Sequence, residues 1–367
     1  MATTGRARLI AAVAQADPVD GRGRRLVAER ACRRGEVLLQ EQPLLIWGPD
    51  AQASVAADGG VELELAGEEL GNFDALAALL AFRALTPEAQ DRLRCLDGKD
   101  GSSAHSARLA IQKLSDTSSD VISASRVSAD EYAEIAGIIS ANAAENSDGR
   151  RAVFNVLSMA NHSCSPNAAW RTSNDATGEK ELVCIAPKIA EGEEVCISYL
   201  PERELFLLTT DPRQARLEEA RSFRCLCGRC IRTDESSKQK DSQLATLTEE
   251  LLAGVPAATD KESAIQQCKD IGARLRRLDT LWPAASALKA SLWSSYVDLL
   301  VSYGAPQALM IGAAQKALEE SRPCLAAAAW RTQEQVLHRK LAAVCRAPRS
   351  QQEERVPAEP PATPALP

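Results

Sequence analysis

Hydrophobic and polar residues alternate along the first part of the chain, in short runs separated by turn-forming residues. Such alternation is typical of β-strands that bury one face. Gly21, Gly35 and Pro43 interrupt the pattern, which indicates turns between the strands. We therefore expect a small β-meander near the N-terminus. Its predicted strands are 9–13, 25–28, 36–41 and 44–47.

Helical periodicity replaces the alternation in the middle of the chain. Apolar residues recur at intervals of three and four over 72–96, and a second run of this kind covers 128–139. Ser128 and Glu131 have the spacing of a capping box at the start of the second run. A Ser-, Asp- and Gly-rich segment, 97–120, separates the two runs. The pattern predicts a helical insertion between two β-rich parts.

The second β-rich part begins with an apolar run, 153–160, that ends in the polar segment Asn161–Asn167. Strand-like runs follow at 181–186 and 194–199, joined by a turn at 189–193, and a short helix is predicted over 213–220. From Leu244 the pattern is helical and interrupted by prolines, which predicts an α-helical bundle.

Composition and charge narrow the class of protein. The chain has 367 residues, 45% of them hydrophobic and 25% charged, which is typical of a globular protein. No apolar run reaches the roughly 18 residues of a membrane span, and the first residues lack the apolar core of a signal peptide. We therefore expect an intracellular protein, cytoplasmic and/or nuclear, that does not bind membranes. The net charge of −7 argues against a general nucleic-acid binder.

The cysteines are scattered except for one cluster, Cys225-Leu-Cys227-Gly-Arg-Cys230. In a reducing compartment, such a cluster indicates a metal more often than a disulfide. A closed structural zinc site needs four ligands, so we predict that Cys164 is the fourth. His162 could also bind the metal, but we expect it to be a packed and hydrogen-bonded side chain.

Several segments together resemble the SET-domain protein lysine methyltransferases, in that family's order and at similar spacing. The segments are Gly23–Arg30, Asn161–Asn167, Gly192–Tyr199 and Phe223–Cys230. The insertion and the helical C-terminal region look most like the SMYD subfamily, and the opening strands resemble its arthropod-type members. The resemblance covers about residues 8–232 by motif and the remainder by helical character alone.

The resemblance implies an α+β fold, with small β-sheets joined in the SET pseudoknot and a C-terminal α-helical domain. It divides the chain into an N-terminal SET segment (8–49), a helical insertion (50–140), a C-terminal SET segment (141–201), a zinc-bound post-SET segment (202–232), an α-helical domain (240–347) and a disordered tail (348–367).

The resemblance also implies S-adenosylmethionine as a cofactor. The Asn161–His162 pair would meet its adenine, and Gly23, Arg24 and Arg25 would lie along its methionine part. Asn142, which we place in a strand-like run 139–142, would be a further polar contact.

Two aromatic residues complete the implied site. Tyr199 would lie at the methyl-transfer channel as the catalytic residue, and Phe223 would close over the cofactor and the substrate lysine. The zinc ligands would be Cys164, Cys225, Cys227 and Cys230. Methyl transfer to an amine needs a neutral lysine and an in-line approach, which an apolar channel favours.

The implied function is an S-adenosylmethionine-dependent protein-lysine N-methyltransferase that acts on a histone or another protein. The alternative is a catalytically weak or inactive SET protein that serves as an interaction scaffold or a transcription-regulatory module. Two departures from the SMYD pattern favour the alternative. Arg221 stands where many SMYD enzymes have a tyrosine, and residues 48–94 contain neither Cys nor His for a MYND zinc finger.

Overall fold

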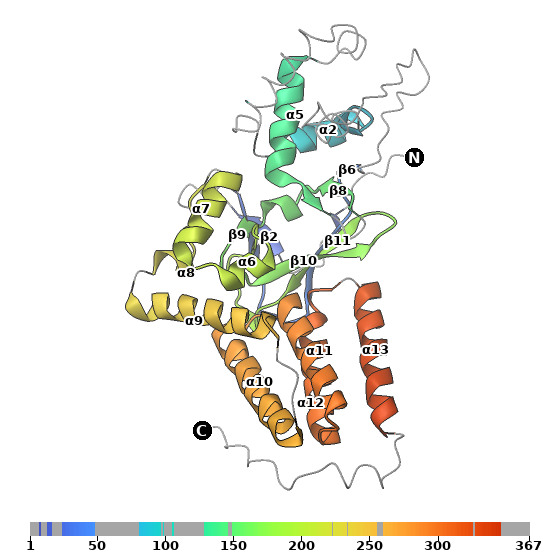
Figure 1. Ribbon diagram of the computed structural model, residues 1–367. Helices are drawn as coiled ribbons and strands as arrows, with labels where there is room; N and C mark the ends of the chain where they lie inside the picture. The colour runs from blue at the N-terminus through green and yellow to red at the C-terminus, as the bar shows by residue number, and fades with distance from the viewer. Residues whose placement is uncertain are drawn as a thin grey trace, which may run out of the picture. The chain divides into compact units, whose positions relative to one another are not determined.

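The computed structural model describes residues 7–8, 13–16, 24–47, 81–96, 98, 105, 128–145, 149–221, 223–232, 234–254, 260–325 and 327–345 (Figure 1). The predictions for 9–12, 50–80 and 348–367, and for nearly all of 97–120, lie outside these residues. The chain forms two compact units. The first contains Met1–Leu200 and Gln214–Ile231, and the second contains Pro201–Arg213 and Arg232–Pro367.

The largest sheet of the first unit is antiparallel, in the order β1-β5-β11-β10. Its strands are β1 (Ala7–Arg8), β5 (Val37–Glu41), β11 (Glu179–Cys184) and β10 (Ala168–Asn174). Leu39 lies opposite Leu182 across β5 and β11, and both side chains are fully buried. The strands predicted over 36–41 and 181–186 are therefore confirmed, with ends shifted by up to two residues.

In the part of the chain that the structure describes, four smaller sheets accompany this one. β2 (Val13–Ala16) pairs with β3 (Arg25–Ala28), and β4 (Cys32–Arg33) pairs with β12 (Lys188–Ile189). β6 (Leu45–Trp47), β8 (Arg151–Val153) and β7 (Ala144–Glu145) form a three-stranded sheet. β9 (Asn161–His162) pairs with β13 (Cys196–Ile197). A 3₁₀ helix, η1 (Leu157–Met159), precedes β9.

Among the described residues, two hydrophobic clusters lie in the first unit. Leu26, Leu38 and Phe154, all fully buried, belong to the cluster between the small sheets. The second cluster packs α2 (Pro87–Arg94) and α5 (Ala129–Asn142) against the β6–β8 sheet through Phe82 and Ile135. The described helices of the predicted insertion therefore share a core with the sheet rather than standing apart from it.

The prediction for 139–142 is wrong. This run is the last turn of α5, and Asn142 is the final residue of the helix. Ile135, Ile138 and Ile139 are all buried on one side of α5, so tertiary packing overrides the strand preference of β-branched residues. The start of α5 agrees with prediction, because Ser128 Oγ accepts a hydrogen bond from the Glu131 N–H at 3.1 Å.

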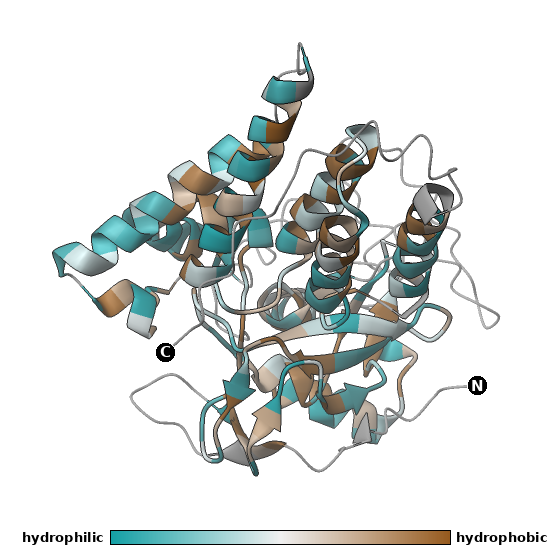
Figure 2. Ribbon diagram, turned by 90° about the horizontal axis from the view of Figure 1, so that it is seen from below, coloured by the Kyte–Doolittle hydropathy of each residue, from teal (hydrophilic) through white to brown (hydrophobic). Residues whose placement is uncertain are grey.

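The second unit is α-helical, as predicted from Leu244 onward. Its helices are α6 (Glu202–Leu207), α9 (Glu235–Leu252), α10 (Lys261–Leu281), α11 (Ala287–Ser302), α12 (Gln307–Ser321) and α13 (Ala327–Cys345). Trp293, Tyr296, Leu300 and Met310 are buried between them. Figure 2 shows hydrophobic and hydrophilic residues along the same helices, as expected of helices that bury one face.

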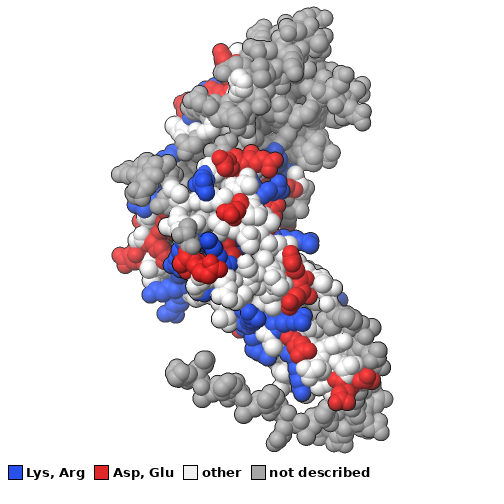
Figure 3. Space-filling view, turned by 60° about the vertical axis from the view of Figure 1, so that its left-hand side comes forward, with Lys and Arg blue, Asp and Glu red and all other residues white. Residues whose placement is uncertain are grey.

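α7 (Thr210–Arg221) contributes residues to both units, and α8 (Gly228–Ile231) is a single turn in the cysteine cluster. Among the described helices, none combines the length and the apolar composition needed to cross a bilayer. The face of the molecule in Figure 3 presents basic and acidic side chains next to one another.

Candidate active site and metal centre

The site is built where two separate segments pair side by side. β9 runs parallel to β13, with Asn161 opposite Cys196 and His162 opposite Ile197. Asn167 joins the segments again further on, because its side-chain oxygen accepts from the Cys196 N–H at 2.8 Å and its amide donates to the Glu194 carbonyl at 2.8 Å. These bonds fix the chain on both sides of the pair.

A turn with a left-handed glycine leads into this arrangement. Gly192 has a φ of +78°, a backbone conformation that residues other than glycine rarely adopt. After the turn, the Val195 N–H donates to the Leu26 carbonyl and the Ala28 N–H donates to the Glu193 carbonyl. The predicted turn at 189–193 is therefore confirmed, and β3 lies next to the segment that leads into β13.

Tyr199 follows the end of β13 by two residues, and its ring contacts the ring of His162 on β9. The Tyr199 hydroxyl donates to the Ala160 carbonyl at 2.9 Å, and its backbone N–H donates to His162 Nδ1 at 2.9 Å. The two ring centroids are 5.3 Å apart. The aromatic ring, the hydroxyl and the main chain of Tyr199 are thus all fixed by the segment Ala160–His162.

Phe223 and Arg221 complete this group from the segment that precedes the cysteine cluster. The Phe223 ring stands edge-on to His162 at 5.9 Å and to Tyr199 at 6.2 Å between centroids. The Arg221 guanidinium lies 5.6 Å from the centre of the Tyr199 ring and donates to the Ser140 carbonyl at 2.6 Å. We call Tyr199, His162, Phe223 and Arg221 the tyrosine cluster.

Two of the residues predicted to contact a cofactor, Asn161 and Arg24, are hydrogen-bonded to each other next to His162. Asn161 Nδ2 donates to the Arg24 carbonyl at 3.3 Å and to Glu194 Oε1 at 2.9 Å. Arg25 follows on β3, and its Nε is buried with no hydrogen-bond partner in the described part of the chain. Gly23, predicted with them, lies outside the described residues.

Asn142 lies at the end of α5, where the neighbouring carbonyls of Ser140 and Ala141 accept hydrogen bonds from Arg221. Its own side-chain amide donates to the Ile138 carbonyl at 2.8 Å, one helical turn earlier. The structure therefore brings the end of this helix next to the tyrosine cluster, with part of the Asn142 amide engaged within the helix.

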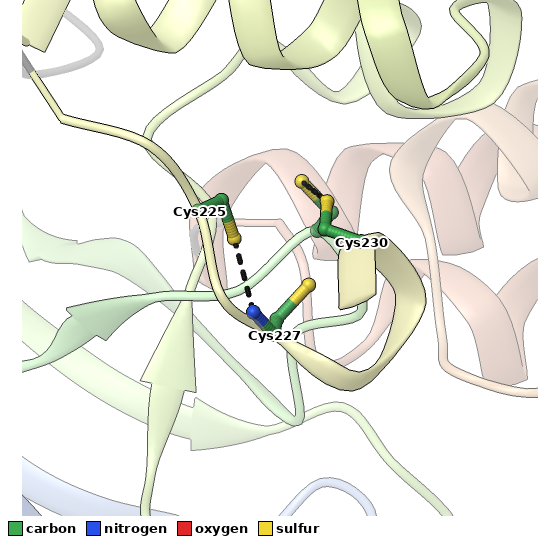
Figure 4. A group of neighbouring side chains, drawn as sticks. Cys225, Cys227 and Cys230 are labelled. Atoms are coloured by element: carbon green, nitrogen blue, oxygen red, sulfur yellow. Dashed lines mark hydrogen bonds between the residues drawn. The ribbon is translucent and has the colours of Figure 1, made fainter. Parts of the chain in front are cut away.

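The four predicted zinc ligands converge. The sulfur atoms of Cys164, Cys225, Cys227 and Cys230 all lie within 4.8 Å of one another. Tetrahedral zinc with Zn–S bonds of about 2.3 Å holds its sulfurs about 3.8 Å apart, so a small contraction would complete the coordination. Figure 4 shows the side chains of Cys225, Cys227 and Cys230 pointing toward a common centre. The donor set, four cysteines with three of them buried, fits a structural zinc ion.

Hydrogen bonds among the four thiols shift their pKa values in opposite directions. A hydrogen bond from Cys164 lowers the pKa of Cys227 to about 5 and also lowers the pKa of Cys225. The same interaction with Cys225 raises the pKa of Cys164. Without a metal, proton sharing limits the repulsion among the sulfurs, and a bound Zn²⁺ would instead keep all four ionised.

Two residues that the sequence analysis did not identify hold the cysteines in place. The Gln214 side chain donates to the Cys225 carbonyl at 2.7 Å and accepts from the Cys225 N–H at 2.8 Å. Arg229 donates to the Cys164 carbonyl at 3.0 Å. Gln214 acts on backbone groups eleven positions away, which no local sequence pattern reveals. Arg229 lies inside the cysteine run, where a basic residue could have been considered.

His162 connects the metal cluster with the tyrosine cluster. Its Nε2 lies 3.3 Å from the sulfur of Cys164, while its Nδ1 accepts from Tyr199. The expectation that this histidine is packed and hydrogen-bonded agrees with the geometry. The described cysteine group that could hold a metal does not include it.

Comparison with known proteins agrees with this arrangement. Residues 23–200 match the SET domain family. Over 86 residues, 23% of this chain and 17% of its relative, the sequence is 36% identical to the histone-lysine N-methyltransferase ATXR2 of Arabidopsis thaliana. It is 38% identical over 78 residues to the protein-lysine N-methyltransferase SMYD4 of Mus musculus, which is 21% of this chain and 9% of SMYD4.

A third relative is the SET domain-containing protein SmydA-8, isoform B, of Drosophila melanogaster, 36% identical over 80 residues. That match covers 22% of this chain and 16% of SmydA-8. The similarity to each of these proteins therefore spans less than a fifth of the relative's length. The predicted resemblance and fold class are confirmed: residues 23–200 match the SET domain family, and the sequence is similar to SMYD4 and SmydA-8.

Proposed function

We propose that this protein is an S-adenosylmethionine-dependent protein-lysine N-methyltransferase. The observation that carries the proposal is the position of Tyr199 within the SET domain. Its hydroxyl is held on the Ala160 carbonyl, and its ring is packed between His162 and Phe223. An oriented hydroxyl and a carbonyl beside aromatic rings are the groups that would align an amine for in-line methyl transfer.

Residues on β3 and β9 suit the proposed cofactor. When bound, S-adenosylmethionine supplies a methyl group activated on a sulfonium. Its methionine part carries a carboxylate, and the buried Arg25 Nε is a donor that such an anion would satisfy. Asn161 would present its backbone to the adenine, while its side chain stays on the Arg24 carbonyl.

The tyrosine cluster would also prepare the substrate. A lysine amine attacks only in its neutral form, and removal from water disfavours the charged ammonium. The rings of His162, Tyr199 and Phe223 provide apolar surfaces for this purpose. The Ala160 carbonyl, which accepts from Tyr199, has a second lone pair that could receive an N–H of the incoming amine.

The printed names of two relatives, a histone-lysine and a protein-lysine N-methyltransferase, support a lysine side chain of a histone or another protein as substrate. A zinc ion bound by the four cysteines would serve a structural role by fixing the segment that carries Phe223 and Arg221 beside Tyr199.

A second candidate is a SET protein with weak or no catalysis that acts as an interaction module. Arg221 favours it, because its guanidinium lies against the face of the Tyr199 ring and adds a cation where a lysine would have to approach. Within the described residues, the only hydrogen-bond acceptors of Arg221 are the backbone carbonyls of Ser140 and Ala141.

Calorimetric titration with S-adenosylmethionine tests whether the protein binds the cofactor. Absence of binding would rule out the proposed enzyme. With binding, wild type should methylate lysines on a histone and peptide array, and Tyr199→Phe should transfer at least about tenfold more slowly, as expected when an orienting hydroxyl is lost. Tyr303→Phe, in the helical unit, is the matched control and should retain full transfer. Equal rates for Tyr199→Phe and wild type would remove Tyr199 from its proposed role.

If the wild type binds the cofactor but does not transfer, Arg221→Tyr separates the two candidates. Activity gained by that variant would mean that Arg221 blocks an otherwise complete site. No gain would favour the interaction module.

A further inference from the structure

The imidazole of His162 has a hydrogen-bond partner on each nitrogen. Nδ1 lies 2.9 Å from the backbone nitrogen of Tyr199, and Nε2 lies 3.3 Å from the sulfur of Cys164. A backbone N–H can only donate, so Nδ1 must be the acceptor and must carry no hydrogen. The neutral ring therefore carries its hydrogen on Nε2, where it can donate to the sulfur of a metal ligand.

The two partners belong to the two halves of the site. Cys164 is a member of the metal cluster, and Tyr199 is the centre of the tyrosine cluster. The His162 ring also contacts the rings of Tyr199 and Phe223, at 5.3 Å and 5.9 Å. The position of one ring therefore sets both the main chain and the aromatic surroundings of Tyr199.

Metal binding would fix this ring. A donor to a ligand sulfur is oriented by the ligand, and such outer partners tune metal affinity in return. Once Cys164 is held by the metal, the Nε2–H has a fixed, negatively charged acceptor, and the opposite nitrogen faces the Tyr199 N–H.

We propose that His162 is a positioning residue that connects the occupied metal centre to Tyr199. This inference rests on the proposed role of Tyr199 and adds a coupling to it: the metal would act on methyl transfer through one imidazole, in addition to holding the post-SET loop. The competing interpretation is that His162 only fills space between the two clusters.

Two substitutions separate the two bonds. The amide of His162→Asn reaches about as far as Nδ1, so it can still accept from the Tyr199 N–H but cannot reach Cys164. The longer His162→Gln places its amide near the Nε2 position, so it can donate to Cys164 but leaves the Tyr199 N–H without its acceptor. Each variant thus removes one half of the connection.

Metal affinity is the readout for the Cys164 half, measured by chelator competition with Zn²⁺ and by the thiolate charge-transfer band of the Co²⁺-loaded protein. We expect His162→Asn to weaken metal binding by about 10- to 100-fold and to shift the band, as typical losses of outer-shell partners do. His162→Gln should stay close to wild type in both measurements.

The environment of Tyr199 is the readout for the other half. In protein labelled with 3-fluorotyrosine, the ¹⁹F signal of Tyr199, assigned by Tyr199→Phe, should move in zinc-loaded His162→Gln and stay near its wild-type position in zinc-loaded His162→Asn. Tyr132, buried in the same unit on α5, is the internal control and should not move in either variant.

The coupling would be established if His162→Asn changed only the metal affinity and His162→Gln changed only the ¹⁹F signal of Tyr199. Equal changes of both readouts in both variants, or no change in either, would overturn it and leave His162 as packing. Neither readout needs catalysis, so the outcome is independent of whether the protein transfers methyl groups. If it does, His162→Gln should lower kcat more than it changes KM for the methyl donor.

Discussion

At the scale of single residues, Arg221 has a structural role that is separate from catalysis. It joins the end of α7 to the last turn of α5 by donating to the Ser140 carbonyl at 2.6 Å, and it lies on the Tyr199 ring. A cation at the C-terminal end of a helix is favourable, and so is a charged hydrogen bond to a carbonyl.

We expect Arg221→Met, which keeps the bulk of the side chain, to lower the free energy of unfolding by about 1–3 kcal/mol. Urea denaturation followed by far-UV circular dichroism measures it. Arg216→Met is the matched control on the same helix, because the Arg216 side chain is 55% exposed and its 3.6 Å pair with Glu219 lies at the surface. Its effect should stay within about 0.5 kcal/mol. Equal losses in the two variants would contradict the role of Arg221.

Glu41 is a buried carboxylate at the end of β5. It accepts hydrogen bonds from the backbone N–H groups of 155–157 at 2.8 to 3.1 Å and thereby fixes the approach to η1 and β9. Burial raises the pKa of Glu41, although these hydrogen bonds act in the opposite direction. Its native state therefore holds the proton more tightly than the unfolded chain does.

This gives a pH dependence with a definite sign. The contribution of Glu41 is complete below the ordinary pKa of 4.5 and is lost as pH rises through the raised native value. The difference in unfolding free energy between wild type and Glu41→Gln should therefore be larger near about pH 4 than near about pH 8. A series of urea titrations across this range measures it.

Glu36→Gln is the control with the opposite sign. A hydrogen bond with Arg30 lowers the pKa of Glu36, so its contribution is present above 4.5 and is lost as pH falls through the lowered native value. The difference for this variant should shrink toward low pH. Parallel pH profiles for the two variants would refute the assignment of the Glu41 shift to burial.

At the scale of elements, the segments that were predicted correctly are those whose local pattern and tertiary environment agree. β3 alternates between partly buried and buried residues, and β5 carries the apolar run Val37–Leu39; both were predicted as strands. β10 was not predicted, because Arg171, Thr172 and Ser173 give it no apolar alternation. It forms a strand because it pairs with β11, and this tertiary contact is not visible in the local sequence of β10. The last turn of α5 was misread for a related reason, since packing decided between helix and strand.

In the metal site, too, the sequence pattern revealed some residues and not others. The spacing of Cys225, Cys227 and Cys230 indicated a cluster, and the need for a fourth ligand pointed to Cys164. Gln214 could not be found this way, because it acts on the backbone of Cys225 and the type of residue at that position is irrelevant to the contact. Roles that depend on main-chain groups are invisible in side-chain patterns.

Gln214 gives a prediction for α7 and the cysteine loop. Gln214→Ala removes both bonds to Cys225 and should weaken Zn²⁺ binding by about 10-fold or more without abolishing it. Cys227→Ser, which removes a ligand, should abolish stable binding of the single expected zinc ion. Chelator competition followed by metal analysis measures both, and Arg216→Ala, also on α7, is the control. An unchanged Zn²⁺ affinity in Gln214→Ala would show that the cysteine loop does not depend on the two hydrogen bonds between Gln214 and Cys225.

At the scale of the whole molecule, the two units have different sources of stability. The first is held by small sheets and the cysteine cluster. The second contains a buried ion network, in which Lys289 Nζ contacts Glu320 at 3.1 Å, Asp279 at 3.0 Å and the Trp282 carbonyl at 3.0 Å. Lys289 and Glu320 are each only 1% exposed. Removing one member would leave an uncompensated charge in the helical core.

We expect Lys289→Met to destabilise the helical unit by about 3–5 kcal/mol, because the buried Glu320 carboxylate loses its ion pair with Lys289. Adding Glu320→Gln should restore part of this loss, because the glutamine oxygen can still accept from the Ser286 N–H while carrying no charge. Lys340→Met, which breaks an exposed pair with Asp298 in the same unit, is the control and should change the stability little.

Because two units need not unfold together, scanning calorimetry is combined with a measurement of the zinc retained by the cysteine cluster. A lowered transition with unchanged zinc retention would show that the two units unfold independently, whereas loss of zinc at the same temperature would show that the first unit depends on the helical unit for its stability.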